Sequence, residues 1–113
     1  MKTFEIKIYV GLREGYTNIV HPIEEVEAIC QKYCNEIGLC VTVTPTKFIY
    51  KDGCEKGAVI GLINYPRFPS TEKEILERAE EIAGYCLHQF KQNRISIIST
   101  TGTYMIDKKD QSL

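Results

Sequence analysis

Hydrophobic and polar residues alternate near the start of the chain, where Phe4, Ile6, Ile8 and Val10 are separated by more polar positions. A period of two is typical of a strand with one face on a core. We therefore predict a first strand that ends near Leu12. The next segment, 11–21, contains two glycines and no clear period, so it is predicted to be a long loop of the kind that often carries function.

Two later segments repeat apolar residues at helical spacing. Pro22 suits a first helical position and Gly38 suits a stop, which predicts a helix over 22–37. A second helix is predicted from the Thr71–Glu74 capping box to a left-handed end at Asn93. The predicted core stripes are Ile23, Val26, Ile29, Cys30, Tyr33, Cys34 and Ile37 in the first helix, and Ile75, Ala79, Ile82, Ala83, Cys86, Leu87 and Phe90 in the second.

Between these helices the chain is rich in β-branched and aromatic residues. Asp52–Gly53 is a strong hairpin signal, so we expect two strands, about 39–50 and 55–65, to pair through this turn. Pro45 indicates that the earlier strand is bulged or lies at a sheet edge. The later strand is apolar at nearly every position from Ala58 to Ile63, which is typical of a strand covered on both faces.

One more strand is predicted after the second helix. Residues Arg94 to Ile98 alternate, and the strand can run on through Ile106 with a bulge or bend at Gly102. The element order is then β-α-β-β-α-β in a single domain, residues 1–106, followed by a disordered tail, 107–113.

This order resembles that of small ferredoxin-like proteins, by topology alone and without a diagnostic motif. The resemblance implies an α+β fold, with a four-stranded antiparallel sheet in the order 4-1-3-2 and two helices on one face. The other sheet face would carry either the Ala58, Ile60, Leu62 set or the Val59, Gly61, Ile63 set. Because neither set is polar, we expect a homodimer through this open face, or else a monomer that covers it with its own loop or last strand.

Composition and charge exclude several classes of function. The chain has 113 residues, 14 basic and 15 acidic, with a net charge of −1, so nucleic-acid binding is not expected. The predicted third strand also lacks the aromatic octapeptide of RNA-recognition modules. Charges interrupt the first apolar stretch and no apolar run reaches the ~20 residues of a membrane span. We therefore expect a cytoplasmic protein that does not contact membranes.

The five cysteines form an odd set and are expected to be reduced. Cys30, Cys34 and Cys86 fall on helix core stripes and behave as small hydrophobes, and Cys40 is expected to be half-buried. Cys54 follows the Asp–Gly turn near lysines, so it is predicted to be exposed with a lowered pKa. The spacing forms no zinc knuckle and the two histidines are far apart in sequence, so no metal, cofactor or catalytic residue is predicted.

The predicted topology gathers basic and polar side chains at one end of the sheet, near the N-terminus of the first helix. Backbone N–H groups at such a terminus favour an anion. The candidate ligand-binding residues are Arg13, Tyr16, Thr17, Lys51, Lys56 and Arg94. The expected ligand is a small anion of the nucleotide or carboxylate type, and the alternative is a solvated rim of mixed charge.

These features favour a non-enzymatic cytoplasmic module that is dimeric through its sheet and binds a small anionic ligand or a protein partner. Two alternatives stay open. One is a small dimeric α+β barrel enzyme that acts on a small molecule and uses a Tyr or Arg in a cavity. The other is a protein-interaction or inhibitory factor of bacterial or phage type.

Overall fold

The computed structural model describes residues 2–67 and 69–108. Along the chain the elements are β1 (Glu5–Gly11), α1 (Ile23–Ile37), β2 (Thr42–Tyr50), β3 (Gly53–Ile63), α2 (Glu72–Gln89), β4 (Arg94–Ser99) and β5 (Gly102–Asp107). Of the predicted tail, Asp107 closes β5 and residues 109–113 lie outside the described residues. Neither helix in the described ranges is long and apolar enough to cross a lipid bilayer.

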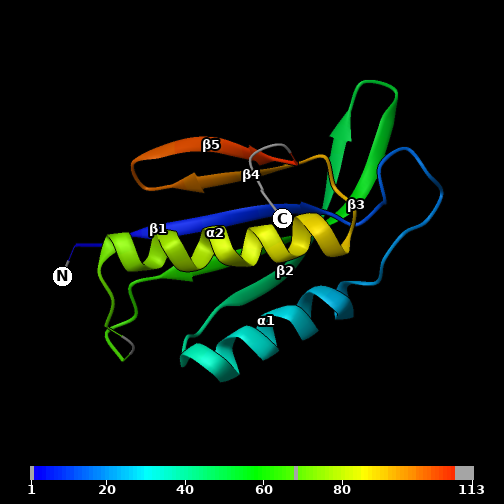
Figure 1. The fold of residues 1–113 in the computed structure, drawn as a ribbon. Coiled ribbons are helices and arrows are strands. Elements are labelled where there is room, and N and C mark those ends of the chain that lie inside the picture. The colour runs from blue at the N-terminus through cyan, green and yellow to red at the C-terminus, as the bar shows by residue number, and fades with distance from the viewer. Residues whose placement is uncertain (1, 68, 109–113) are drawn as a thin grey trace.

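The sheet has five antiparallel strands in the order β2-β3-β1-β4-β5, so the predicted four-stranded sheet in the order 4-1-3-2 is wrong. The chain reverses at Thr100–Thr101 instead of bulging at Gly102, and Ser99 pairs with Gly102 across the turn. The Ser99 hydroxyl donates to the Gly102 carbonyl and accepts from the Thr101 N–H. The segment expected to extend the fourth strand therefore folds back as a separate edge strand (Figure 1).

Both helices lie on one face of the sheet, where they cover its core side (Figure 1). Alternate β1 residues Ile6, Ile8 and Val10 are fully buried, and their β3 partners Leu62, Ile60 and Ala58 are buried with them. Of the two alternating sets of β3 residues, Ala58, Ile60 and Leu62 therefore face the helices. The opposite face carries Val59, Gly61 and Ile63, mixed with polar neighbours such as Lys7, Thr42, Thr44 and Ser96. This open face is therefore less apolar than the β3 sequence suggests.

Local signals explain where the helices begin and end. Gly38 adopts a left-handed conformation at φ 74° and its N–H donates to the Cys34 carbonyl, which confirms the predicted stop of α1. The Thr71–Glu74 capping box is present at the start of α2. That helix ends at Gln89, and the left-handed residue that follows is Lys91 (φ 50°), not the predicted Asn93.

Candidate functional site

Arg13, Tyr50 and Glu55 form a cluster at the end of the sheet where β1 and the β2–β3 hairpin meet. The Arg13 guanidinium donates to the Glu55 carboxylate at 2.5 Å, and the Tyr50 hydroxyl donates to the same oxygen at 3.0 Å. The pairing of Gly11 with Gly57 explains the contact, because continuing this antiparallel register past β1 places Arg13 opposite Glu55. Main-chain pairing, not sequence proximity, thus assembles the cluster.

Hydrogen bonding to one carboxylate fixes the charge state of its two donors. The hydrogen bond to Glu55, aided by its negative charge, raises the pKa of Arg13. The hydrogen bond to Glu55 also raises the pKa of Tyr50, with smaller contributions from burial and from the Glu55 charge. The cluster therefore consists of a cation, a neutral phenol and a carboxylate held between them.

A cavity of about 310 Å³ lies beside this cluster, and a cavity of this size can hold a small molecule. Its walls come from the β1–α1 loop and the hairpin: Arg13, Val20, Lys47, Cys54, Glu55 and Lys56. Val20 is placed there because it forms an isolated β-bridge with Arg13, which folds the loop back on itself. Three cations face one carboxylate, so the cavity favours an anionic group.

Aromatic side chains adjoin the cluster on the sheet. Phe48 pairs with Glu55 in the β2–β3 register, and its ring lies 6.4 Å from that of Tyr9. Gly57 permits this packing, because a Cβ there would collide with the Phe48 ring and the Val10 carbonyl. By register, Tyr9, Phe48 and Glu55 share the open face of the sheet. Rings beside a charged cluster suit a planar heterocycle or an organic cation.

A second cluster centres on His21, just before α1. The His21 Nδ1 lies 2.6 Å from Glu25, and its Nε2 lies 3.6 Å from the buried Glu14, which is also 3.6 Å from Lys91. The imidazole packs on the buried Phe90 ring at 5.0 Å. The α1 N-terminus is therefore surrounded by carboxylates, which disfavours an anion there. The i,i+4 spacing of His21 and Glu25 was the sequence signal that could have revealed this cluster.

The candidate ligand-binding residues are only partly brought together. Arg13 and Lys56 line the cavity, and Glu55, Lys47 and Tyr50 are the neighbours that sequence reasoning missed. The other four candidates are not among the residues that line this cavity. Tyr16 is 96% exposed, Thr17 donates to the Glu14 carbonyl within the loop, Lys51 is exposed in the hairpin turn, and Arg94 begins β4 opposite Asp107.

Four thiols have the expected burial, whereas Cys34, expected in the core stripe of α1, is less buried than predicted. Cys30 and Cys86 are buried, Cys34 and Cys40 are half-buried, and Cys54 is exposed at the cavity. Burial raises the pKa of Cys30 to about 12 and raises that of Cys86 further. Within residues 2–67 and 69–108, no group of His, Cys, Asp and Glu is arranged to hold a metal ion.

The fold and this charged cavity describe a small α+β protein suited to bind a small molecule. No family model and no curated protein matches the chain. Two solved structures do match. A phage SAM lyase in complex with S-methyl-5′-thioadenosine aligns with a TM-score of 0.74 and 15% identity, over 97% of this chain and 93% of that one. A phage SAM lyase in its apo state aligns with a TM-score of 0.73 and 16% identity, over 96% and 92%.

At this identity the likeness establishes a shared fold.

Proposed function

We propose that this protein is an enzyme that cleaves a small adenosyl sulfonium compound, with S-adenosylmethionine as the first candidate substrate. The observation that carries the proposal is the whole-chain likeness to phage SAM lyase, combined with a charged cavity at one end of the shared sheet. An enzyme can keep a fold while its sequence diverges, but the site must then match the substrate in chemistry.

The proposed substrate carries a carboxylate, an ammonium, a sulfonium and an adenine ring. Arg13, Lys47 and Lys56 suit the carboxylate, because all three line the cavity. Glu55 suits the positively charged sulfonium, because it is the acidic side chain among the residues that line the cavity. Tyr9 and Phe48 lie on the open sheet face with Glu55, whereas Lys47 and Lys56 belong by register to the opposite face, so these rings are not assigned to the adenine. The carboxylate of this substrate would then be the small anionic group that the sequence led us to expect as a ligand.

In the proposed reaction the bond between the sulfonium sulfur and the aminobutyrate side chain breaks. Its electron pair stays on sulfur, which leaves as the neutral thioether of S-methyl-5′-thioadenosine. The aminobutyrate fragment is completed either by attack of its own carboxylate on that carbon, which closes a lactone and needs no base, or by loss of a neighbouring proton to solvent water, which leaves an alkene. Because Glu55 already accepts from Arg13 and Tyr50, we assign it to position the sulfonium and not to remove a proton.

Dimerisation through the open sheet face belongs to this proposal. A second copy on that face would cover the Tyr9 and Phe48 rings and exclude water from the neighbouring cluster. The dimer expected from the sequence would then have a catalytic role, because the single chain leaves these rings only half-buried.

The test is a turnover assay. Purified protein is incubated with S-adenosylmethionine, and S-methyl-5′-thioadenosine is measured by chromatography against a protein-free sample that reports spontaneous breakdown. We expect product above this background, and a loss of about 100-fold or more in Glu55→Gln, as for removal of an electrostatic group at a reacting centre. The matched control is Glu5→Gln, a carboxylate of β1 that pairs with Lys7 away from the cavity.

Product formation at the background rate by the wild-type protein would refute the proposed reaction. A calorimetric titration then distinguishes the remaining functions. Binding of S-adenosylmethionine without turnover would indicate a ligand-binding protein that is not an enzyme for this compound. Absence of binding would show that adenosyl sulfonium compounds are not its ligands.

A further inference from the structure

Two side chains of the turn that follows α2 contact the β1–α1 loop. Lys91 lies 3.6 Å from the Glu14 carboxylate. Gln92 reaches the main chain of the loop, because its side-chain amide donates to the Arg13 carbonyl at 2.6 Å. A residue 79 positions away in sequence therefore holds the main chain of Arg13, whose side chain forms part of the wall of the cavity beside Glu55.

The backbone of Gln92 is itself fixed by the end of α2. Lys91 is left-handed, and its N–H donates to the His88 carbonyl at 3.3 Å, while the Gln92 N–H donates to the Leu87 carbonyl at 2.9 Å. This pair of bonds is the Schellman motif that closes many helices. The Gln92 amide also donates to the Phe90 carbonyl at 3.1 Å. The side chain that holds Arg13 thus extends from a well-fixed turn.

The end of β1 leaves room for this side chain. A Cβ at Gly11 would lie 2.6 Å from the Gln92 Oε1, so a larger residue there would displace the amide. Two main-chain hydrogen bonds across the loop are accepted by the carbonyls of Leu12 and Ile19. The Gln92 amide therefore supports the Arg13 carbonyl, which these two bonds do not use.

A displacement of the Arg13 main chain would reach the cavity through its side chain. The Arg13 guanidinium donates to Glu55 at 2.5 Å, and its Nε is shielded from solvent. Val20, which forms the isolated bridge with Arg13, lines the same cavity. Movement at Arg13 would therefore disturb both the cation assigned to the substrate carboxylate and the partner of Glu55.

From these contacts we propose that Gln92 is a positioning residue for the cavity beside Glu55: by holding the Arg13 carbonyl, it keeps the guanidinium at Glu55. Gln92 is not among the described residues that line the cavity, so its effect passes through Arg13. The effect on turnover rests on the proposed function, whereas the placement of Arg13 does not.

The test is Gln92→Met, since methionine keeps the length of the side chain and removes the N–H donor. We expect kcat/KM for S-adenosylmethionine to fall about tenfold, because a small displacement of a positioned group is costly. In an Arg13→Gln protein the same change should alter kcat/KM less than about twofold, because the residue through which Gln92 acts is already missing. Gly11→Ala should reproduce the loss by pushing the amide aside, and combining it with Gln92→Met should add less than about twofold.

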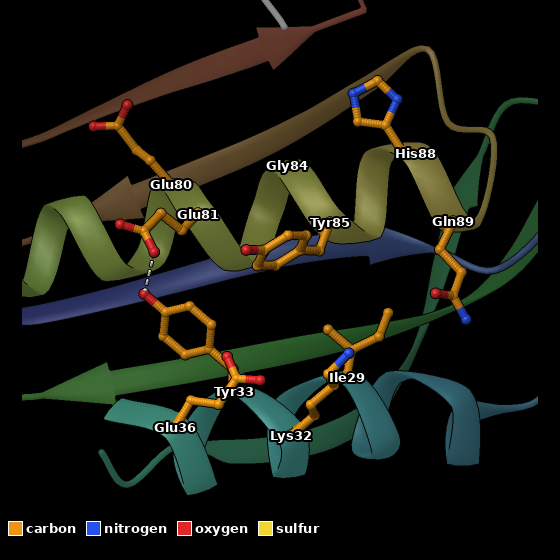
Figure 2. A pocket seen from close by; sticks show the side chains of 10 residues that line it. All are labelled: Ile29, Lys32, Tyr33, Glu36, Glu80, Glu81, Gly84, Tyr85, His88 and Gln89. Carbon is orange, nitrogen blue, oxygen red and sulfur yellow. Dashed lines mark hydrogen bonds between the residues drawn. The ribbon is translucent and has the colours of Figure 1, made fainter. Parts of the chain in front are cut away.

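Gln89→Met is the matched control. Gln89 is the last residue of α2, is exposed and lines the groove between α1 and α2 (Figure 2). This variant should keep the wild-type kcat/KM. An equal loss in Gln89→Met would overturn the proposal, and so would a full loss from Gln92→Met in the Arg13→Gln protein. Circular dichroism verifies that each variant is folded at the assay temperature.

A measurement without substrate separates the positioning role from the proposed reaction. The Arg13 Nε–H gives an NMR signal that is assigned by its loss in Arg13→Gln, and its exchange with water should be slow because Nε is shielded. Gln92→Met should accelerate this exchange about fivefold by loosening the loop, whereas Gln89→Met should not. Unchanged exchange in Gln92→Met would overturn the positioning role even in an active enzyme. Faster exchange in Gln92→Met alone, with wild-type turnover at the background rate, would support the positioning role and refute the reaction.

Discussion

The Arg13 guanidinium and the Glu55 carboxylate, 42 residues apart in sequence, join the β1–α1 loop to the β2–β3 hairpin through a hydrogen bond of 2.5 Å. This pair lies at the wall of the proposed catalytic cavity and has side chains that are only 33% and 27% exposed. The contact reinforces the main-chain hydrogen bond from the Leu12 N–H to the Lys56 carbonyl, so it should contribute to stability as well as to the site.

A double-mutant cycle with Arg13→Gln and Glu55→Gln should give a coupling of about 1 kcal/mol, the upper part of the range for exposed pairs. The Lys7–Glu5 pair serves as the control, because it is longer, at 3.6 Å, and more exposed. Its coupling should be about 0.3 kcal/mol. Urea unfolding of each set measures both, and equal couplings would show that partial burial adds nothing to the Arg13 pair.

Gly57 should not tolerate a side chain. A Cβ at this position would lie 2.7 Å from the Val10 carbonyl oxygen and would collide with the Phe48 ring. Gly57→Ala is therefore expected to destabilise the fold by about 1–3 kcal/mol, as overpacking against a backbone atom does. The matched control is Gly102→Ala, where a Cβ meets open space. Thermal unfolding that gave equal midpoints for the two variants would contradict this explanation of the Phe48 packing.

The hydrogen bond from Tyr33 to Glu81 should make stability depend on alkaline pH. Burial, followed by this hydrogen bond, raises the pKa of Tyr33 from 10.0 to about 12. Because the folded state favours the protonated phenol, this contribution is complete below pH 10 and is lost as pH rises towards 12. Tyr33→Phe should cost about 1 kcal/mol at pH 8. The difference from wild type in urea unfolding should shrink between pH 10 and 11, whereas a constant difference would argue against the phenol as its source.

The cysteines should react in an order set by burial. Cys54 is exposed, whereas burial of Cys30 and Cys86 raises the pKa of both thiols and keeps reagent away. Iodoacetamide at pH 8, followed by peptide mass spectrometry, should modify Cys54 first and leave the two buried thiols intact until the protein unfolds. In Cys54→Ser the fast phase should disappear. Early labelling of Cys86 would instead indicate that α2 opens locally.

Much of the local structure could be predicted from the sequence because its causes are local. The alternation from Phe4 to Val10, the Thr71–Glu74 capping box and the Gly38 stop each act within a few residues. The Thr100–Thr101 reversal escaped prediction because threonine favours strands and the turn lacks an Asn–Gly or Asp–Gly pair.

The candidate site was harder to predict because it depends on register. Arg13 was a candidate, yet its partner Glu55 follows only from the pairing of β1 with β3. A shift of one residue in that pairing would place Glu55 on the other face of the sheet. Lys56, its neighbour, was likewise a candidate, but no local pattern shows that both residues line one cavity with Arg13.

The open sheet face gives the last prediction, which concerns assembly. This face carries half-buried Val59 and Ile98, together with Ile63 at 36% and Met105 at 56% exposure. A stable dimer buries about 800 Å² on each chain. Light scattering at tens of micromolar should therefore give the mass of two chains, and Ile98→Lys should halve it by placing a charge in the interface. Ile37→Lys is the matched control, because it adds the same charge at an exposed apolar residue of α1. A strict monomer for wild type, or equal dissociation by both variants, would mean that the open face does not join two copies and that the Glu55 site functions within one chain.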